Sequence, residues 1–235
     1  MGLKRGRRAR KGAAMDVTRG GWRIRLRPWG PDLGPAMALR AARFRDGRDD
    51  GDAFDPSWRH LTVEGAGGLA AYARLSVQDA GVMGRGYAAQ SYDLSPLAAR
   101  FARAVEVGRV CLATEAPDLP RLLLGAFAQV TEAEGATLLY GCASFPGTDP
   151  AMLSAVSHHA VPWGPRRASP AAVDLPPHGR AALPRLLRLY LAFGASVSDH
   201  AVIDRDLGTT HVLAMLPVAD IPPGRARLLR AMLAA

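Results

Sequence analysis

Two apolar strands flank an amphipathic helix in the middle of the chain, and this stretch decides the fold. Residues 104–112 read AVEVGRVCL, residues 118–134 read DLPRLLLGAFAQVTEAE, and residues 137–145 read TLLYGCASF. The first and third segments have the apolar character of buried strands, and Asp118 and Pro120 are typical of a helix start. A strand, a helix and a second strand predict a right-handed crossover between parallel strands.

Further strands and helices are predicted on both sides of this unit. Residues 22–27 (WRIRLR) alternate apolar and charged side chains, and residues 60–64 and 69–77 are typical of a hairpin. The remaining expected elements are a helix over 32–44, an extended segment over 87–92, a helix over 96–104, a helix after residue 150, an irregular segment over 162–177, a helix over 183–193, strands over 197–204 and 209–218, and a helix over 225–233. This order predicts a single α/β (α+β) domain, with a mixed twisted sheet and helices on both faces.

The composition is that of a globular protein with a substantial core. Apolar residues make up 49% of the 235 residues, which excludes a disordered chain, a collagen and a disulfide-stapled miniprotein. No apolar run reaches the roughly 18–20 residues of a membrane span, and no secretory signal is seen. Cys111 and Cys142 have no metal-binding or redox spacing, so we expect reduced thiols in a cytoplasmic protein.

Basic charge is concentrated at the N-terminus. Six of the positive charges that give a net charge of +9 lie within residues 1–14, which contain no acidic residue. Such a tail can contact anionic lipid at a membrane surface or nucleic acid. The simpler alternatives are a disordered extension and a true start at Met15. We therefore expect a basic, disordered tail over residues 1–18 and one folded domain over residues 19–235.

Four segments, in this order along the chain, resemble one enzyme family. They are QSYDLSPL (90–97), EVGRVC (106–111), GCASFPGTDP (141–150) and AVIDRDLGTT (201–210). Together they closely resemble the ornithine–acyl-[acyl carrier protein] N-acyltransferase family over roughly residues 25–222. The resemblance implies the fold of the N-acetyltransferase superfamily, which acyl-homoserine-lactone synthases share. It also implies the first step of ornithine-lipid synthesis, which makes lyso-ornithine lipid.

The related lactone synthases have a pattern of charged residues that also occurs here. It implies that the site includes an arginine and a phenylalanine of the first helix and two aspartates of the following loop. It also implies an arginine on a central strand, and a glutamate and an arginine on the diverging strand. These residues are Arg40, Phe44, Asp52, Asp55, Arg74, Glu106 and Arg109.

Glu106 and Arg109 are the residues that we assign to catalysis. A carboxylate on a central strand loses solvation, which raises its pKa toward that of a useful base for the substrate ammonium group. The structural alternative is an ion pair between Glu106 and Arg109. These residues would face opposite sides of a strand unless a bulge intervenes, and Gly108 is a candidate for that bulge.

The acyl group needs an apolar slot and a donor for its developing oxyanion. We expect the donors to be backbone N–H groups around Val110, Cys111 and Leu112, and the slot to lie between the strands at 106–112 and 138–145. Leu138, Leu139 and Phe145 are expected either to line this slot or to be ordinary core residues.

The donor is expected to be the 4'-phosphopantetheine thioester of an acyl carrier protein, with no bound cofactor. Relatives that use acetyl-CoA hold its pyrophosphate with a glycine-rich loop, whereas residues 112–121 contain no glycine. Arg121, near a helix N-terminus, is a candidate for the single phosphate. The other arginines of a docking face for an acidic carrier protein are Arg100, Arg103, Arg166 and Arg167, or else these are plain surface residues.

Acidic residues suit an acceptor that carries an extra ammonium group. Asp52 and Asp55 are expected to recognise L-ornithine with Arg40 or Arg74, or to form an ion-pair network that fixes the loop. We also assign Cys142 and Ser144 to the substrate site. Neither is expected to act as a nucleophile, because the motifs of catalytic serine and cysteine are absent. No metal site is predicted, since the adjacent His158 and His159 lack further ligand spacing.

The sequence therefore predicts a cytoplasmic enzyme, peripheral at most to the inner membrane face, that moves a (3-hydroxy)acyl group to the α-amino group of L-ornithine. Two alternatives within the superfamily are a lactone-type synthase that uses S-adenosylmethionine and a non-catalytic relative. The second is suggested by ATEAPD at residues 113–118, where the family has histidine–proline and tyrosine–arginine pairs. A nucleic-acid-binding protein has only the basic tail in its favour, so we expect no nucleic-acid partner.

Overall fold

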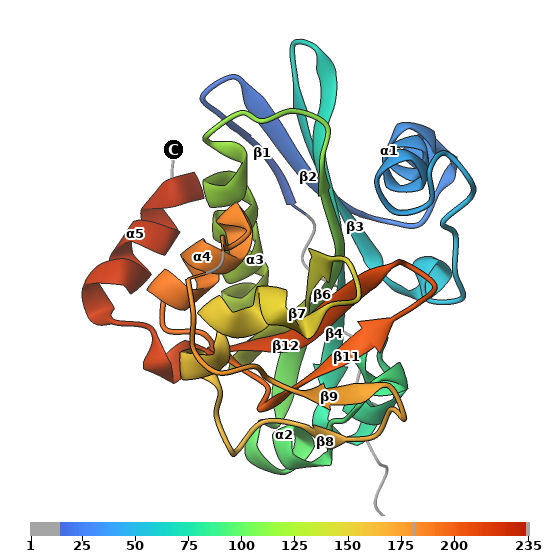
Figure 1. Cartoon of the computed structure of the whole chain (residues 1–235). Helices are drawn as coiled ribbons and strands as arrows, with labels where there is room; N and C mark the ends of the chain where they lie inside the picture. The colour runs from blue at the N-terminus through green and yellow to red at the C-terminus, as the bar shows by residue number, and fades with distance from the viewer. Residues whose placement is uncertain (1–14, 181, 234–235) are drawn as a thin grey trace, which may run out of the picture.

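Strands from both halves of the chain pair into one ten-stranded sheet, with helices on both faces (Figure 1). The computed structural model describes residues 15–180 and 182–233. The strands of this sheet are β1 (Met15–Arg19), β2 (Trp22–Pro28), β3 (Arg59–Gly65), β4 (Gly68–Asp79), β6 (Arg103–Leu112), β7 (Leu138–Pro146), β9 (Ala172–Asp174), β10 (Ser196–Val197), β11 (His200–Asp204) and β12 (Thr209–Pro217). A second sheet pairs β5 (Tyr92–Asp93) with β8 (Arg166–Arg167).

Five α-helices are found in the described part of the chain, together with short 3-10 helices. The α-helices are α1 (Gly34–Phe44), α2 (Ser95–Arg100), α3 (Leu119–Ala133), α4 (Arg185–Ala192) and α5 (Pro223–Leu233). The 3-10 helices are η1 (Pro31–Leu33), η2 (Asp55–Ser57), η3 (Ala80–Arg85), η4 (Ala88–Gln90), η5 (Pro150–Ala155), η6 (Ser157–His159) and η7 (Val218–Asp220). No helix of residues 15–180 and 182–233 has the length and apolar character needed to cross a bilayer.

The strand order in the large sheet is β1-β2-β3-β4-β6-β7-β12-β11-β9, with β10 beside β12. All neighbouring pairs are antiparallel except β6 and β7, which are parallel and connected by α3. The parallel pair predicted from the sequence is therefore confirmed. It joins an N-terminal half-sheet to a C-terminal one.

β6 and β7 diverge soon after they begin to pair. Their register runs from Ala104 opposite Leu138 to Glu106 opposite Tyr140 and then stops. Beyond this point β6 remains paired with β4 up to Leu112, while β7 remains paired with β12. Each strand is thus held by its own half-sheet, so the two halves diverge like the arms of a V.

Gly141 lies where the strands begin to diverge. A β-carbon placed on Gly141 would lie 2.3 Å from the carbonyl oxygen of Val107, whereas β-carbons in proteins essentially never lie within 3.0 Å of such an atom. A side chain at this position would have to push β6 away. The glycine of the GCASFPGTDP motif therefore permits the closest approach of the two strands.

A bulge interrupts β6 within its diverging part. Tyr72 lies opposite Cys111 and Arg74 lies opposite Gly108, so β6 has one residue more than β4 in this interval. Arg109 adopts a left-handed conformation, with φ of 52°. The bulge expected at Gly108 is therefore present, but Arg109 is the residue in the left-handed region. This shift turns Arg109 toward the sheet face on which Glu106 lies.

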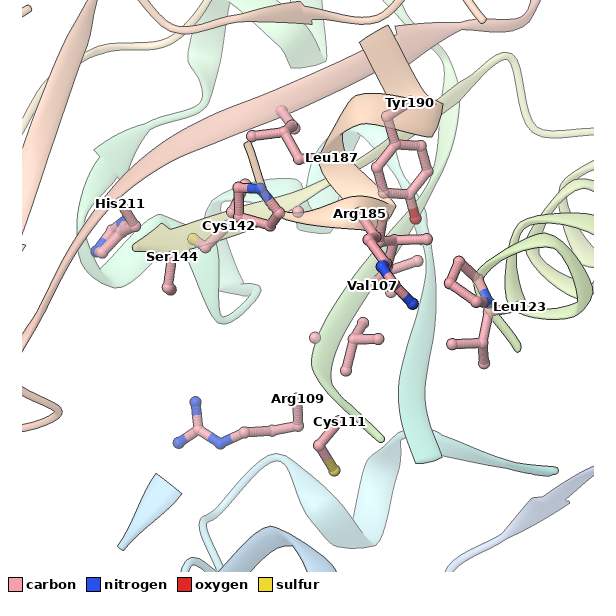
Figure 2. A pocket seen from close by; sticks show the side chains of 18 of the residues that line it. Val107, Arg109, Cys111, Leu123, Cys142, Ser144, Arg185, Leu187, Tyr190 and His211 are labelled. Carbon is pink, nitrogen blue, oxygen red and sulfur yellow. The ribbon is translucent and has the colours of Figure 1, made fainter. Parts of the chain in front are cut away.

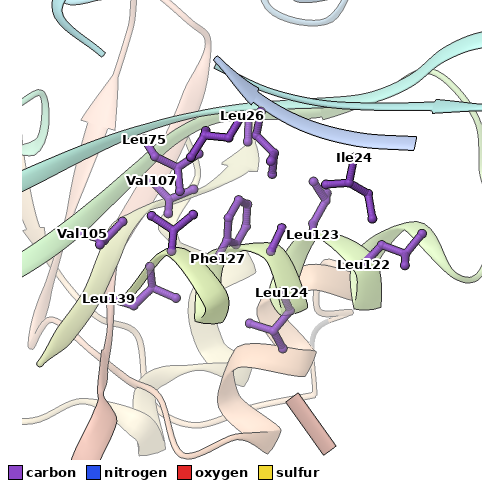
Figure 3. Packing of buried hydrophobic residues seen from close by; sticks show 14 of the residues in the cluster. Ile24, Leu26, Leu75, Val105, Val107, Leu122, Leu123, Leu124, Phe127 and Leu139 are labelled. Carbon is purple, nitrogen blue, oxygen red and sulfur yellow. The ribbon is translucent and has the colours of Figure 1, made fainter. Parts of the chain in front are cut away.

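The largest apolar core lies between the sheet and α3 (Figure 3). Val105 and Val107 of β6 face α3, and Leu123 and Phe127 on that helix pack against the strands. Burying a side chain of this size stabilises the fold by about 1.5–3 kcal/mol. The opposite face is covered by α1 and by the segment from η3 to α2, each over a separate apolar cluster. Helices on both faces were expected, and this prediction is confirmed.

Some predicted elements differ in kind or extent. The extended segment expected over 87–92 instead contains η4 and the first residue of β5. Ala88 and Tyr92 of this segment are buried in an apolar cluster against one face of the sheet. The helix expected after Asp149 is the 3-10 helix η5, which Asp149 caps by accepting the N–H of Ala151. The segment over 162–177 contains β8 and β9, short strands fixed by pairing with β5 and β11.

The boundary between tail and domain also differs from the expectation. β1 includes residues 15–18, which fall within the predicted tail, because Met15 to Arg19 pair antiparallel with β2. The domain therefore reaches at least residue 15. The six basic residues of the predicted tail lie outside the described residues.

The close approach at Gly141 leads to a prediction for stability. Gly141→Ala should lower the free energy of unfolding by about 1–3 kcal/mol, because the added methyl group collides with the backbone of β6. For a chain of this size the melting temperature should fall by roughly 2–12 °C, measured by thermal unfolding. The matched control is Gly84→Ala, where a β-carbon has no neighbour within 4 Å. Equal melting temperatures for the two variants would contradict the prediction.

Candidate active site

A cavity of about 650 Å³ occupies the space between the diverging strands. One wall is formed by residues 107–112 of β6 and another by residues 139–144 of β7. Figure 2 shows Cys142, Ser144 and His211 on one side of the opening and Arg109 and Cys111 on the other. The predicted site residues that line it are Phe44, Arg109, Val110, Cys111, Leu112, Cys142 and Ser144.

Most of the cavity wall is apolar, and a large part of it comes from α4 and the residues before it. Leu186, Leu187 and Tyr190 face the cavity, opposite Leu123 of α3 and Leu139 of β7. The sequence analysis predicted a helix here but gave it no role. Its signal was the spacing of four leucines and one tyrosine around two arginines in RLLRLYLA, which puts a broad apolar stripe on one face.

Three residues expected to bind carrier or acyl group are placed elsewhere. Phe145 is buried in a separate cluster with Leu153 and Val212, and Leu138 is buried below α2, so both are core residues and not part of the cavity wall. Arg121 is exposed on α3 and does not line the cavity, although its neighbour Pro120 does. The alternation of side chains along β7 explains why Leu139 faces the cavity while Leu138 does not.

A second pocket, of about 460 Å³, adjoins the apolar cavity and is polar. Its charged residues are Arg45, Asp52, Arg109, Asp204, Arg205 and Asp206. Four side chains line both spaces, namely Tyr87, Arg109, Asp204 and His211. We call these four the junction residues. They mark the place where the described cavity and the described pocket meet.

Asp204 is the one acidic residue of the polar pocket without an ion pair in the described part of the chain. Asp52 binds Arg74 through both of its carboxylate oxygens, at 2.6 and 2.7 Å. Asp206 pairs with Arg45 at 2.7 Å. Asp204 accepts only the backbone N–H of Leu207, at 3.0 Å. Its carboxylate therefore remains available to a cation.

A network of buried charges supports the floor of the polar pocket. Arg40 binds Asp50 at 3.0 Å and Asp55 at 2.6 Å. Arg74 binds Asp55 at 2.7 Å, and Arg109 binds Asp50 at 2.8 Å. At its edge, Arg45 binds Asp50 at 3.2 Å and also pairs with Asp206. Apart from this edge pair and with Asp52 included, the network contains three arginines and three aspartates, so its formal charges balance.

Most members of this network are too deeply buried to contact a substrate. The side chains of Arg40 and Arg74 are fully buried, and that of Asp55 is 2% exposed. The substrate contacts expected for these three residues are therefore replaced by the structural alternative, in which they fix the loop before β3. Asp52, at 23% side-chain exposure, is the aspartate of the network that lines the pocket.

Hydrogen bonds and charge also fix the ionisation of this network. Burial alone would raise the pKa of Asp55, but hydrogen bonds from Arg40 and the backbone of Asp52 hold it below its usual value. The pKa of Asp52 is likewise lowered by Arg74 against the effect of burial. Both aspartates therefore remain charged at neutral pH.

Glu106 lies behind the cavity wall, and its carboxylate lines neither the cavity nor the polar pocket. It accepts hydrogen bonds from the backbone N–H of Ala88 at 2.6 Å and from Nε2 of Gln78 at 2.7 Å. Tyr140 is a residue that lines the cavity, and its hydroxyl donates to Oε1 of Gln78 at 2.6 Å and lies 3.4 Å from Oε2 of Glu106. Burial raises the pKa of Glu106 to about 7.

The alternative in which Glu106 pairs with Arg109 is not found. In residues 15–180 and 182–233 the ion pairs of Arg109 are with Asp50 and Asp52, and its Nη1 donates to the hydroxyl of Tyr87 at 2.8 Å. The Nη2 group is 3.7 Å from Asp52, so it keeps capacity for another acceptor. The bulge thus directs the guanidinium into the junction. Glu106 forms no ion pair in the part of the chain that the structure describes, and burial raises its pKa by more than the charge of Arg74 lowers it.

The two cysteines are buried thiols. Burial raises the pKa of Cys111 to about 12 and raises that of Cys142 further. A thiol that stays protonated is a poor nucleophile. Both side chains therefore act as small apolar parts of the cavity wall.

Sequence reasoning missed several residues of the site. Asp50 lies two residues before the aspartate pair that the pattern selected, and the run DDGD at 49–52 was its only signal. Tyr87 and Asp204 lie in segments that the resemblance flanked or included, but nothing in their spacing indicated that they would meet. His211 follows the paired threonines of the last motif. Pairing of β12 with both β7 and β11 brings it to the junction.

Comparisons with known proteins agree with this architecture. Residues 36–119 match the family model described as "Acetyltransferase (GNAT) domain". A solved structure of an uncharacterized protein from Bacillus halodurans has a TM-score of 0.53 and 8% identity, covering 94% of this chain and 98% of that one. The predicted acetyltransferase-like fold is confirmed.

Two similar proteins share one name. A protein of Rhodobacter capsulatus named "L-ornithine N(alpha)-acyltransferase" is 33% identical over 195 residues, which cover 73% of this chain and 75% of that protein. A protein of Rhizobium meliloti with the same name is 29% identical over 244 residues, covering 92% of this chain and 80% of that protein.

The buried network leads to a prediction for stability and its pH dependence. Asp55→Asn should lower the free energy of unfolding by about 3–5 kcal/mol at pH 7, because Arg40 and Arg74 lose a buried counter-charge. The lowered pKa of Asp55 stabilises the fold above its unfolded value of about 4, and this contribution disappears as pH falls through the folded value. The difference between wild type and variant, measured by denaturant unfolding, should therefore shrink at strongly acidic pH.

The control for this prediction is Asp206→Asn. Asp206 also pairs with an arginine, but its side chain is 73% exposed, so the loss should stay below about 1 kcal/mol. An equal loss in the free energy of unfolding for the two variants would show that burial does not make the ion pairs of Asp55 more important for stability than the exposed pair of Asp206.

Proposed function

Because the chain belongs to the family of L-ornithine N(alpha)-acyltransferases, we propose that it transfers a (3-hydroxy)acyl group from an acyl carrier protein to the α-amino group of L-ornithine. The product is then lyso-ornithine lipid. The observation that carries this proposal is the meeting of a long apolar cavity with a polar pocket at Arg109, Asp204 and His211. An acyl chain and a charged amino acid need these two environments side by side.

The apolar cavity suits the acyl chain and its thioester. Leu123, Leu139, Leu187 and Tyr190 offer apolar contacts, which favour a chain by about 0.8 kcal/mol for each buried CH₂ group. Along β6 beyond Glu106, no strand of residues 15–180 and 182–233 pairs with the side that faces β7. Backbone groups in this part of the strand are the candidates for donors to the oxyanion of the thioester.

The polar pocket suits an amino acid with a second ammonium group. The free capacity of the Arg109 guanidinium supports binding of the α-carboxylate at the junction. The unpaired Asp204 supports binding of an ammonium group. An acceptor held between these residues presents its α-amine to the cavity, where the thioester lies.

An acidic carrier protein suits the surroundings of the cavity. Arg185 lines the cavity and has a side-chain exposure of 57%, and Arg188 lines it on the same helix. Of the five arginines expected to form a docking face, Arg121 adjoins the wall at Pro120. Arg103 is instead engaged with Asp79. We therefore place the carrier protein over α4 and the start of α3.

Direct attack of the amine on the thioester is the proposed mechanism. The amine nitrogen forms a bond to the carbonyl carbon, and the C–S bond then breaks to release the phosphopantetheine thiol. Before attack, the ammonium group must lose a proton. Glu106, with a pKa of about 7, is the proposed acceptor of that first proton. The proposed route is the hydroxyl of Tyr140, which accepts the proton and passes its own hydrogen to Glu106 after turning away from Gln78.

A competition assay tests the proposed function. Purified protein is incubated with 3-hydroxyacyl carrier protein and an equimolar mixture of ornithine, lysine, glutamine, glycine and S-adenosylmethionine, and products are identified by mass spectrometry. N-acyl-ornithine is the expected product. The control contains carrier protein without an acyl group. Acylation of another amine would overturn the acceptor, and no product with a competent donor would overturn the transfer itself.

The pKa of Glu106 leads to a prediction for the pH profile. At saturating acceptor, kcat should fall about tenfold per pH unit below about pH 7, because the carboxylate becomes protonated. Glu106→Gln should lower kcat by about 10²–10⁴-fold and remove this acidic limb. The control is Glu64→Gln on β3, whose carboxylate pairs with Arg25 outside both spaces. Persistence of the limb in Glu106→Gln would assign it to another group.

A further inference from the structure

His211 is the only histidine among the junction residues. It lies on β12 opposite Ser144 of β7, and its side chain lines both the apolar cavity and the polar pocket (Figure 2). A group at this place is close to both partners of the transfer, namely the amine in the pocket and the sulfur in the cavity.

The hydrogen bonds of Tyr92 fix which nitrogen of His211 carries the proton. The hydroxyl of Tyr92 donates to the carbonyl oxygen of His211 at 3.0 Å. This hydroxyl has a single hydrogen, and when the carbonyl oxygen receives it, the hydroxyl oxygen accepts at its 3.1 Å contact with Nδ1. We assign the hydrogens in this way. Nδ1 therefore carries the hydrogen, and Nε2 has a lone pair. Nε2 has no hydrogen-bond partner in the described part of the chain.

His211 is also held in its neutral form. The residue is 5% exposed, and burial lowers its pKa to about 4. The ring therefore stays uncharged at neutral pH, with its lone pair ready to accept a proton.

The other junction residues are less suited to moving a proton. The hydroxyl of Tyr87 accepts a hydrogen bond from Arg109, and burial raises the pKa of Tyr87. The guanidinium of Arg109 has no lone pair to offer. Asp204 is the unpaired carboxylate to which the proposed function assigns an ammonium group. His211 is the neutral group among them that can accept a proton and then donate it.

We propose that His211 carries a proton from the acceptor nitrogen to the leaving sulfur, an inference that rests on the proposed acyl transfer. After attack, the nitrogen of the tetrahedral intermediate bears a positive charge and an extra proton. Nε2 of His211 takes this proton, the C–S bond breaks, and the imidazolium gives the proton to the departing thiolate. The amide, the neutral thiol and neutral His211 result. This proton is distinct from the one that Glu106 removes before attack.

The test compares two donors with different leaving groups. One is an acyl thioester of N-acetylcysteamine, whose alkyl thiol leaves as a basic thiolate, and the other is an aryl thioester, whose thiolate needs no proton. With the alkyl donor, His211→Gln should lower kcat by about 10²–10⁴-fold. With the aryl donor the loss should shrink to roughly tenfold or less, since sulfur protonation no longer matters.

Two controls separate catalysis from structure. His200→Gln changes another buried histidine beside the ring of Tyr92, one that lines neither space, and should leave the ratio of the two donor rates unchanged. Tyr92→Phe removes the hydroxyl that fixes the tautomer and should lower the alkyl rate more than the aryl rate. Equal losses with both donors in His211→Gln would overturn the proposal and assign His211 a packing role.

A measurement without activity tests the same point. Nitrogen-15 NMR of histidine-labelled wild-type protein, with the His211 signals assigned by their absence in His211→Gln, should show a neutral ring protonated at Nδ1. A ring protonated at Nε2 or charged at neutral pH would overturn the proposal. A wild-type protein that shows the expected tautomer and yet forms no N-acyl-ornithine is a separate outcome. That result would overturn the proposed function, while the protonation of His211 at Nδ1 would be confirmed.

Discussion

The divergence of β6 and β7 after Glu106 and Tyr140 is the constraint on which the site depends. Paired strands would bury their backbone groups in hydrogen bonds and fill the space between them with side chains. Separated strands leave an apolar cleft with free backbone groups along one wall, which a thioester needs. The divergence persists because each strand is fully paired on its outer side, β6 with β4 and β7 with β12.

The bulge in β6 and the buried charges act together on Arg109. A left-handed residue other than glycine costs of order 1–3 kcal/mol, and three contacts from the guanidinium to Asp50, Asp52 and Tyr87 offset it. Burying charged groups is itself costly, and balanced pairs of this kind add little net stability. Their effect is positional, because the network fixes the loop before β3. It also fixes Arg109, the cation of the junction, with an Nη2 group that can reach a ligand.

The sequence was sufficient for the central strands, the crossover and the charged loop, because each depends on local periodicity or on a short motif. It was not sufficient for β1, β8 and β9, which are fixed by pairing with other strands. It was right that Glu106 would have a raised pKa, since a carboxylate on a central strand must be desolvated. It was not sufficient for the cavity wall. Leu138 and Leu139 look alike in sequence, and only the direction in which each side chain leaves β7 separates core from cavity. His211 and Asp204 come to the junction through long-range strand pairing, which no local pattern reports.

In the proposed reaction, the two substrates bind to different parts of the chain. The apolar cavity takes part of its wall from α3 and α4, whereas the polar pocket is built mainly by the loop after α1, by residues 87–91 and by β11 with the turn after it. The two spaces share only the four junction residues. Substitutions in α4 can therefore alter the preferred chain length while the acceptor pocket stays intact, and changes in the β11–β12 turn can alter the acceptor while the acyl slot stays intact. The scaffold thus lets the lipid tail and the head group of the product diverge independently in evolution.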